Sequence, residues 1–266
     1  MMTPMNSTTP VLEVTSLAKV FGGLRAVNDF NMTIQKGELI GLIGPNGAGK
    51  TTAFNMITGL YYPSRGEILF EGNPIVGLQP HEITQMGIGR TFQNIRLFSN
   101  LSVLDNVRIA YHFHAGYGLP DGIFRTSNFY KKERELTERT QEFLEIFNLN
   151  RFETEIAKNL PYGQQRRLEI ARALACNPRL LLLDEPAAGM NPKEITELMD
   201  LIHFIREKFD LTILLIEHQM RLVMDICEKI TVLDFGEVIA RGTPVEIQNN
   251  PKVVEAYLGK GAANVS

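Results

Sequence analysis

The feature that most constrains this chain is a short apolar run that ends in a glycine-rich loop. The run ELIGLI is followed by GPNGAGKTT, which places Gly44, Gly47 and Gly49 directly before Lys50 and Thr51. Glycine lets the backbone curl so that successive N–H groups point inward at an anion, and a helix that follows adds its positive N-terminal dipole. The apolar run itself predicts a strand buried on both faces, which is typical of a parallel sheet covered by helices.

The loop has the spacing of a nucleotide-binding P-loop, Gly-x-x-x-x-Gly-Lys-Thr. In that pattern Lys50 neutralises the β- and γ-phosphates, and the Thr51 hydroxyl binds Mg²⁺. A chance glycine-rich turn is the alternative, and it is disfavoured by the strand pattern before the loop and the helix-competent segment after it. The expected ATP-binding set is Gly44, Pro45, Asn46, Gly47, Ala48, Gly49, Lys50, Thr51 and Thr52.

A second apolar run, RLLLLDEP, ends in the neighbouring carboxylates Asp184 and Glu185. A carboxylate at the end of a buried strand, beside the strand of a P-loop, is placed to hold Mg²⁺. Glu185 is then placed to orient and deprotonate an attacking water. An acidic pair at the N-terminus of a helix is the structural alternative. The chain has no Asn-Lys-x-Asp sequence of the kind that reads guanine, so we expect ATP as the nucleotide.

Composition excludes several other classes of protein. The 266 residues carry 27 Lys and Arg against 30 Asp and Glu, a net charge of −3, so we expect no broad surface for nucleic acid. Two cysteines are too few for a disulfide framework. No apolar run approaches the roughly 20 residues that span a bilayer, and the first ten residues lack the regions of a secretory signal. We therefore expect a cytosolic chain unless another protein recruits it.

The order of strand and helix patterns predicts an α/β fold. Alternating apolar residues in VLEVTSL and RAVNDFNMTI indicate half-buried strands near the N-terminus. After Pro178, strand and helix patterns alternate, which predicts a mainly parallel sheet covered by helices. The middle of the chain is helical, since KKERELTERTQEFLEIFNL places apolar residues at helical spacing: Leu136, Phe143, Leu144 and Phe147. The glycine- and aromatic-rich stretch at 110–130 predicts a loop or a helix-breaking insertion.

The segment NLPYGQQRRLEIARALACNPRLLLLDEPAAGMNP resembles the signature of ATP-binding cassette (ABC) ATPases running into the acidic strand. From Val11 to about Leu258 the chain is similar to ABC-transporter ATPases, with six motifs in the order of that family. These motifs are the P-loop at 44–52, the Q-loop at Gln93, the signature at Leu160, Pro161, Tyr162, Gly163 and Gln164, the acidic strand at 180–185, the D-loop at 188–191 and the switch histidine His218.

The resemblance implies the fold of ABC nucleotide-binding domains within the P-loop NTPases. That fold has a mostly parallel core sheet, an N-terminal antiparallel β region and an inserted α-helical subdomain. On this basis residues 11–258 form the ATPase domain, with its core at 11–87 and 166–258 and its helical subdomain at about 88–165. Residues 1–10 and 259–266 are expected to be flexible tails.

The resemblance also implies roles for individual residues. Gln93 is expected to reach Mg²⁺ or the attacking water, and His218 to contact the γ-phosphate. Phe21 occupies the position at which such cassettes stack an aromatic ring on adenine, although taken alone this residue is more typical of a core. The expected catalytic residues are Lys50, Gln93, Glu185 and His218, and the expected metal ligands are Thr51, Gln93 and Asp184.

The signature departs from the family pattern Leu-Ser-Gly-Gly-Gln, since it reads Leu-Pro-Tyr-Gly-Gln. In the family, the serine hydroxyl and backbone N–H groups of one subunit bind the γ-phosphate held by the other subunit. Pro161 has neither a hydroxyl nor an N–H, and Asn191 replaces the usual aspartate of the D-loop. We therefore expect an asymmetric heterodimer in which one ATP site is weaker, with a tolerated proline as the alternative.

Several segments resemble the ATPases of bacterial branched-chain amino-acid importers, among them GIGRTFQNIRLFSNLSVLDNV, DEPAAGMNPKE and RGTPVEIQNNPKVVEAYLG. This implies a peripheral place on the cytoplasmic face of the inner membrane. The implied partners are two integral-membrane permeases, a second homologous ATPase (a homodimer being the alternative) and, indirectly, a substrate-binding protein. Transport of urea or amides, export of lipid or lipopolysaccharide, and soluble work in DNA repair or translation stay open as alternatives.

The apolar residues around the Q-loop are expected to receive a permease helix, with ordinary core packing as the alternative. These residues are Ile95, Leu97, Phe98, Leu101 and Val103.

Overall fold

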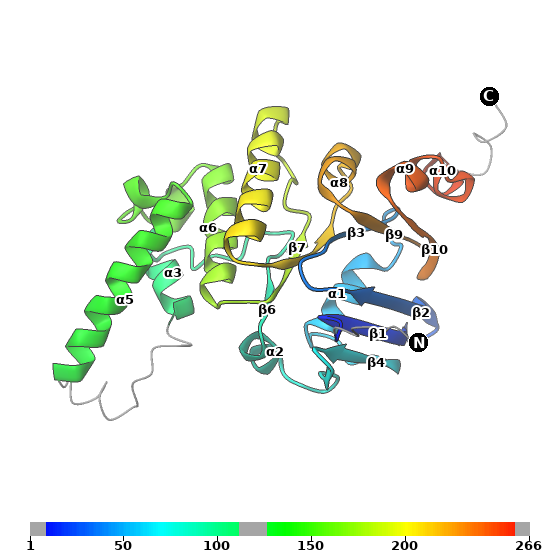
Figure 1. The fold of residues 1–266 in the computed structure, drawn as a ribbon, viewed down its shortest axis with the longest axis horizontal. Coiled ribbons are helices and arrows are strands. Elements are labelled where there is room, and N and C mark those ends of the chain that lie inside the picture. Colours follow the sequence, from blue (N-terminus) through cyan, green and yellow to red (C-terminus); the bar gives the residue numbers. More distant parts are fainter. Residues whose placement is uncertain (1–8, 112–126, 259–266) are drawn as a thin grey trace, which may run out of the picture. The chain divides into compact units, whose positions relative to one another are not determined.

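The computed structural model describes residues 9–111 and 127–258, and it divides into two compact units (Figure 1). The first unit combines the chain up to Ile88 with the chain from Arg179 onward, and the second unit is formed by residues 89–178. The predicted boundary at about 165 falls inside helix α6 (Tyr162–Ala175). This helix belongs to the second unit because it packs against α3 (Val103–Tyr111) of the same unit.

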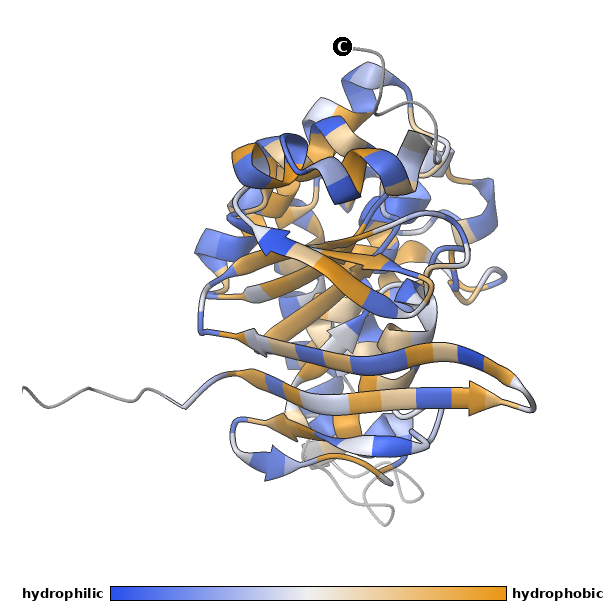
Figure 2. Cartoon of the chain, turned by 90° about the vertical axis from the view of Figure 1, so that its right-hand side faces the viewer, coloured by the Kyte–Doolittle hydropathy of each residue, from blue (hydrophilic) through white to orange (hydrophobic). Residues whose placement is uncertain are grey.

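The first unit begins with a four-stranded antiparallel sheet of order β2-β1-β4-β5. Its strands are β2 (Leu24–Ile34), β1 (Leu12–Phe21), β4 (Arg65–Phe70) and β5 (Asn73–Pro74). Buried and more exposed residues roughly alternate along β1 and β2, and Figure 2 shows the matching alternation of hydrophobic and hydrophilic residues. The predicted N-terminal antiparallel region is confirmed.

The core sheet of the first unit is mostly parallel, as predicted. The five strands that lie wholly in this unit have the order β10-β9-β3-β8-β7, and only the β10–β9 pair among them is antiparallel. They are β10 (Glu237–Gly242), β9 (Lys229–Asp234), β3 (Leu39–Ile43), β8 (Thr212–Ile216) and β7 (Leu180–Asp184). Every residue of β3, β7 and β8 is buried. The boundary between the units falls within β6 (Ile88–Arg90).

One apolar core joins the antiparallel sheet, the central strands and the helix after the glycine-rich loop. The helices of the first unit are α1 (Lys50–Ile57), α2 (Pro80–Met86), α7 (Pro192–Lys208), α8 (Met220–Ile226), α9 (Pro244–Gln248) and α10 (Pro251–Leu258). Helix α1 contributes Ala53, Phe54, Met56 and Ile57 to this core. The loop before α1 therefore lies between a fully buried strand and a helix whose apolar side chains are buried.

The second unit is helical. It contains α3, α5 (Ser127–Ile146), α6 and two short turns of 3-10 helix, η2 (Asn150–Phe152) and η3 (Ala157–Asn159). The four apolar residues predicted at helical spacing are all buried. The predicted insertion at 110–130 is wrong at both ends, because α3 continues to Tyr111 and α5 begins at Ser127, and its middle lies outside the described residues. Within the described ranges, no helix combines the length and apolar character needed to cross a membrane.

Candidate active site

The glycine-rich loop joins β3 to α1, as its sequence predicts. A Cβ atom at Gly44 would lie 2.0 Å from the carbonyl oxygen of Leu233, and one at Gly49 would lie 2.4 Å from that of Ala26. Both glycines also have positive φ. No side chain fits such contacts, so the close approach of this loop to β9 and β2 requires glycine at both positions. A Cβ at Gly47 would meet no atom within 4 Å, so the loop is open there.

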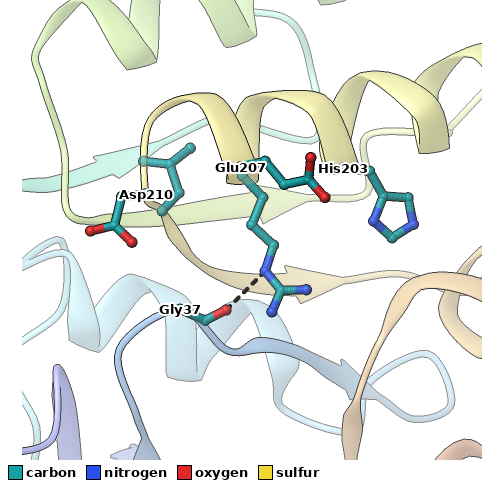
Figure 3. A pocket seen from close by; sticks show the side chains of 6 residues that line it. Gly37, His203, Glu207 and Asp210 are labelled. Carbon is teal, nitrogen blue, oxygen red and sulfur yellow. Dashed lines mark hydrogen bonds between the residues drawn. The ribbon is translucent and has the colours of Figure 1, made fainter.

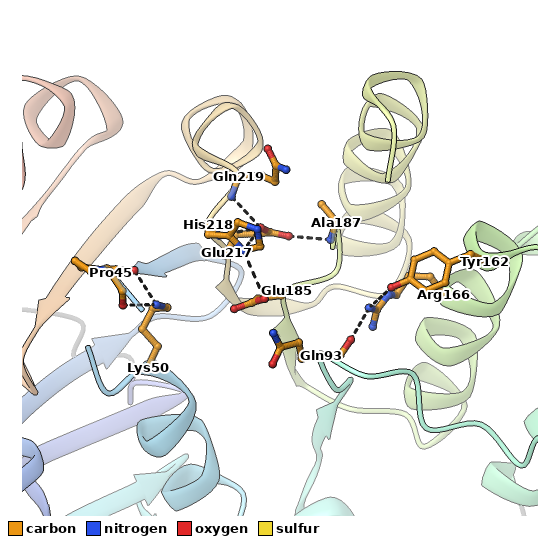
Figure 4. A network of polar contacts seen from close by, with 11 residues as sticks. Pro45, Lys50, Gln93, Tyr162, Arg166, Glu185, Ala187, Glu217, His218 and Gln219 are labelled. Carbon is orange, nitrogen blue, oxygen red and sulfur yellow. Dashed lines mark hydrogen bonds and ion pairs between the residues drawn. The ribbon is translucent and has the colours of Figure 1, made fainter. Parts of the chain in front are cut away.

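Lys50 is the buried cation of this loop. The residue is 7% exposed, and its Nζ donates to the carbonyl oxygens of Gly44 at 2.7 Å and Pro45 at 3.0 Å (Figure 4). Burial lowers the pKa of Lys50, and the negative charges of Glu185 and Asp184 oppose that shift. No side chain caps the first turn of α1. An ammonium group beside an uncapped helix N-terminus fits an anion of high charge, such as the phosphates of a nucleotide.

Asp184 and Glu185 lie where β7 ends. Asp184 is buried, whereas Glu185 is partly exposed and has a φ of 45°, in the left-handed region that non-glycine residues rarely adopt. Strain of this kind costs about 1–3 kcal/mol and gathers at functional sites. The acidic pair does not begin a helix, because the next helix starts at Pro192 with Asn191 as its cap. The alternative of an acidic helix cap is therefore wrong.

His218 follows β8, and its Nδ1 lies 3.5 Å from Oε2 of Glu185. The same nitrogen is 3.8 Å from Oε2 of Glu217, a carboxylate with no exposed surface. Glu217 accepts hydrogen bonds from the backbone N–H groups of Ala187 at 2.8 Å, His218 at 2.8 Å and Gln219 at 3.0 Å (Figure 4). Sequence reasoning missed Glu217. Its only signal was a carboxylate at the end of an apolar strand, directly before the histidine.

Phe21 lies at the end of β1 and is 41% exposed, so the alternative of a core position is wrong. Its ring meets that of Tyr61 edge to face, with 5.3 Å between centroids. The Nζ of Lys19 lies 5.1 Å from the centroid of the Phe21 ring. An exposed aromatic ring beside a cation suits stacking on a flat, electron-rich ring. The adenine contact stays a prediction.

In the second unit, a buried ion pair on α6 holds the Q-loop. The side chains of Arg166 and Glu169 are 0% and 1% exposed and meet at 2.7 Å. Arg166 donates to the carbonyl oxygen of Gln93 at 2.9 Å (Figure 4) and to that of Phe92 at 2.7 Å. Glu169 accepts the N–H of Arg96 at 3.0 Å. The pair fixes the backbone on both sides of Gln93, which is itself exposed. Sequence reasoning missed both members of this pair.

The signature residues form the start of α6. Pro161 is the N-cap, and the helix begins at Tyr162 without a side-chain cap. Leu160 is buried, Pro161 and Tyr162 are exposed, and Gly163 and Gln164 are partly buried. The carbonyl oxygen of Pro161 accepts the N–H of Gln164 at 2.9 Å, as the first bond of the helix. The signature therefore presents the N-terminal end of a helix, with its proline at the first exposed position.

The predicted site residues fall into two groups, one in each unit. Lys50 shares electrostatic interactions with Asp184 and Glu185, and His218 contacts Glu185, all in the first unit. Gln93 and the signature belong to the second unit. Among the described residues, no cluster of three or more His, Cys, Asp or Glu side chains is arranged to hold a metal ion. The hydroxyl at 51 and the carboxylate at 184 are oxygen ligands of the type that Mg²⁺ takes.

The apolar residues around the Q-loop differ in exposure. Phe98 is 47% exposed, and Ile95, Leu97 and Leu101 are partly buried. Val103 is fully buried, so for this residue the alternative of core packing is confirmed.

A pocket of the first unit near the end of α7 lies apart from the predicted site residues. It is lined by Gly37, His203, Arg206, Glu207, Asp210 and Leu211 (Figure 3). Arg206 Nε donates to the carbonyl oxygen of Gly37 at 2.8 Å, and its Nη2 pairs with Glu228 at 2.5 Å. The guanidinium group that lines the pocket thus has partners of its own within the fold.

Comparison with known families decides what this arrangement is. The family model described as ABC transporter matches residues 27–188, which is more than half of the chain. That span contains the glycine-rich loop, Gln93, the signature and the acidic pair. The chain belongs to the ABC transporter family. It is an ATPase of this family, with the nucleotide-binding fold of a P-loop NTPase.

Individual relatives agree with the family. The chain is 48% identical to the high-affinity branched-chain amino acid transport ATP-binding protein BraF of Pseudomonas aeruginosa, over 94% of this chain and 98% of that protein. It is 47% identical to LivG of Escherichia coli strain K12, which has the same descriptive name, over the same shares. A solved ATP-binding cassette of an ABC transporter, in its ADP conformation, matches with a TM-score of 0.82 and 31% identity. The match covers 95% of this chain and all of that one.

A second family model matches the C-terminal part of the chain. It is described as branched-chain amino acid ATP-binding cassette transporter, and it covers residues 237–263. Of the described residues, this range contains β10, α9 and α10.

Proposed function

We propose that this ABC ATPase powers an importer of branched-chain or related amino acids. In this proposal it is bound to the cytoplasmic face of a bacterial inner membrane. The observation that carries the proposal is the 48% identity to BraF across nearly the whole of both proteins. The match of residues 237–263 to the branched-chain model supports the same cargo class over urea, amides or lipopolysaccharide.

In the proposed mechanism, the first unit binds ATP. Backbone N–H groups of the loop at 44–52 bind the phosphates, and Lys50 exchanges its two carbonyl partners for phosphate oxygens. Phe21 stacks on adenine. Thr51 and Asp184 would hold Mg²⁺, which would supply positive charge against the charge that develops on the phosphates.

Glu185 is the proposed general base. Its carboxylate orients the attacking water and takes its proton, while His218, at 3.5 Å from that carboxylate, contacts the γ-phosphate. Gln93 is proposed to contact Mg²⁺ or the attacking water. The signature beginning at Leu160 serves the ATP held by a partner subunit, so that two cassettes close on two nucleotides. Hydrolysis then shifts the populations of closed and open states.

The proposed partners are two integral-membrane permeases and a second, homologous ATPase with a complete signature. A substrate-binding protein acts indirectly through the permeases. The net charge of −3 supports the expectation that nucleic acid is not a partner. These partner assignments go beyond the names of the relatives, which say only that those proteins are ATP-binding proteins of amino-acid transport.

Purification of the tagged full chain from its native membranes tests the proposal. Mass spectrometry of the copurified proteins is expected to identify two polytopic permeases and a second cassette. Recovery with soluble proteins alone, or with nucleic acid, would overturn the transport assignment and leave the ATPase assignment intact.

Uptake by cells tests both the cargo and the loop. Lys50→Ala is expected to weaken ATP binding and to abolish uptake of radiolabelled leucine, because the loop loses its buried cation. Lys36→Ala is the matched control, since Lys36 is an exposed lysine of the same unit that pairs with Asp210. Wild-type uptake by Lys50→Ala would contradict the role of the loop. Uptake of urea or an amide in place of leucine would reassign the cargo.

A further inference from the structure

Glu217 is a buried carboxylate between the two loops that carry Glu185 and His218. Strands β7 and β8 are parallel neighbours, and Asp184 pairs with Ile216 at their ends. The loops that follow the two strands therefore begin at the same edge of the sheet. Glu185 comes directly after β7, and Glu217 and His218 come directly after β8.

The carboxylate bridges these loops through backbone groups. Its Oε1 accepts the N–H of Ala187 at 2.8 Å, from the loop after β7. Its Oε2 accepts the N–H groups of His218 at 2.8 Å and Gln219 at 3.0 Å, from the loop after β8. Hydrogen bonds to an ionised acceptor are roughly twice as strong as neutral ones, and this carboxylate has no exposed surface. Figure 4 shows the bridge.

The hydrogen bond between Glu217 and Ala187 restrains the turn that contains Glu185. Glu185 has its φ of 45° at the first residue after the strand, and the N–H of Ala188 closes the turn on the Glu185 carbonyl at 3.2 Å. Ala187 lies inside this turn, so its bond to Glu217 holds the strained conformation in place. On the other side, Glu217 fixes the backbone of His218 itself, whose Nδ1 lies within 4 Å of both carboxylates.

We infer that Glu217 is a positioning residue for ATP hydrolysis. It sets the separation of Glu185 and His218 and acts on the reaction through them. The inference rests on the proposed roles of those two residues. A role limited to capping α8 would need only the bonds at its own loop, whereas the bond to Ala187 reaches the loop after β7.

The first test is Glu217→Gln in the complex purified from native membranes. The amide keeps the volume of the side chain but has one acceptor oxygen, so it cannot serve both loops. We expect kcat to fall about tenfold or more, because small misplacements of reacting groups carry penalties of that order. KM for ATP should stay unchanged, because the phosphate-binding loop is not altered. Rates are expressed per bound nucleotide, so an unfolded fraction lowers the number of sites and leaves the rate per site intact.

Glu246→Gln is the matched control. This carboxylate also accepts a backbone N–H in the first unit, that of Thr243 at 2.7 Å, but it belongs to the cap of α9. Its kcat should equal that of the wild type. A kcat for Glu217→Gln within about twofold of wild type, or a higher KM at unchanged kcat, would overturn the inference.

A double-mutant cycle separates positioning from a general structural role. Glu217→Gln should cost less in a His218→Ala background than in the wild type, because part of what Glu217 positions is then missing. Equal costs in both backgrounds would overturn the inference. If Glu185→Gln and His218→Ala lose activity while Glu217→Gln keeps it, the inference fails and the proposed site stands. If the first two variants keep wild-type rates, the proposed site itself fails.

Discussion

Glu185 combines two properties at the scale of the single residue. Its backbone is held in the left-handed region, and its carboxylate contacts the imidazole of His218. A glycine would adopt this conformation without strain. A glutamate at this position therefore places a carboxylate there at the cost of backbone strain. This is consistent with a general base whose position matters more than the stability of its turn.

Glu185→Gln is expected to retain ATP and to stop turnover. The amide preserves size and can still orient water, but it cannot take the proton of that water. We expect kcat to fall by at least about 100-fold, within the range for loss of a general base, with unchanged nucleotide binding. Single-turnover hydrolysis and retention of labelled ATP measure the two properties separately. Glu207→Gln, at an exposed position on α7, should behave as wild type. A fully active Glu185→Gln would assign the water to another residue.

At this scale, the sequence predicts residues whose spacing repeats a known chemical pattern. Asp184, Glu185 and His218 lie at or just after strand ends of the first unit, and Lys50 is the first residue of α1 after the glycine-rich loop, as their positions predict. Glu217 could not be predicted in the same way. Its partners are backbone N–H groups, which every residue carries, so that only the fold shows which of them meet a carboxylate.

At the scale of elements, α6 joins two motifs within the second unit. Its first residues are the signature, and its second turn carries the buried Arg166–Glu169 pair that binds the Q-loop backbone. The Q-loop and the signature helix are thus held together by charge-assisted hydrogen bonds to main-chain groups. A change in the backbone conformation at Gln93 is therefore expected to shift the first residues of α6, because Arg166 binds both segments.

Two variants of this helix should differ in stability. Arg166→Met leaves Glu169 as an unpaired buried charge, which costs about 3–5 kcal/mol. Adding Glu169→Met should recover part of that loss, because no buried charge remains. Denaturant unfolding measures both free energies. Hydrogen exchange at the Arg96 amide should be faster in the double variant, since the acceptor of that N–H is gone. Equal stability of the single and double variants would contradict this account of the ion pair.

The sequence predicts most helices and strands correctly, but it predicts their first and last residues less well. The apolar runs of β3, β7 and β8 are buried on both faces, which leaves little choice but a central strand. The ends of α3 and α5 were missed because glycines and aromatic residues in the sequence between them favour a loop. The boundary at about 165 was misplaced because the packing of α6 on α3 is a tertiary contact that no local pattern encodes.

At the scale of the whole molecule, the proposed pairing of two cassettes around two ATP sites gives the signature helix a testable consequence. The helix that begins after Pro161 presents its N-terminal end without a side-chain cap and without the N–H that a serine would provide. The proposed phosphate-binding end of α6 therefore has fewer donors than the family pattern. In the proposed dimer, this deficit predicts an asymmetric pair of sites, one complete and one weaker.

Pro161→Ser tests the asymmetry in the assembled complex. Serine restores a hydroxyl and an N–H, and as an N-cap it should also stabilise α6 by about 0.5–2 kcal/mol. We expect tighter ATP binding at the weaker site and a higher ATPase rate. Pro244→Ser, at the first turn of α9, is the control and should change neither property. An unchanged rate and affinity in Pro161→Ser would mean that backbone contacts suffice and that the proline is tolerated.

The first unit is made from two separated stretches of chain, and this has a consequence for biosynthesis. Strand β3 pairs with β8 and β9, whose residues are translated only after the whole of the second unit. At about 5–20 residues per second, β8 follows β3 from the ribosome by roughly 10 to 30 s. During that interval the apolar strand β3 has neither β8 nor β9 to pair with, and the glycine-rich loop lacks its contact with β9. We therefore expect protection by chaperones to be most needed while residues 89–178 are being made.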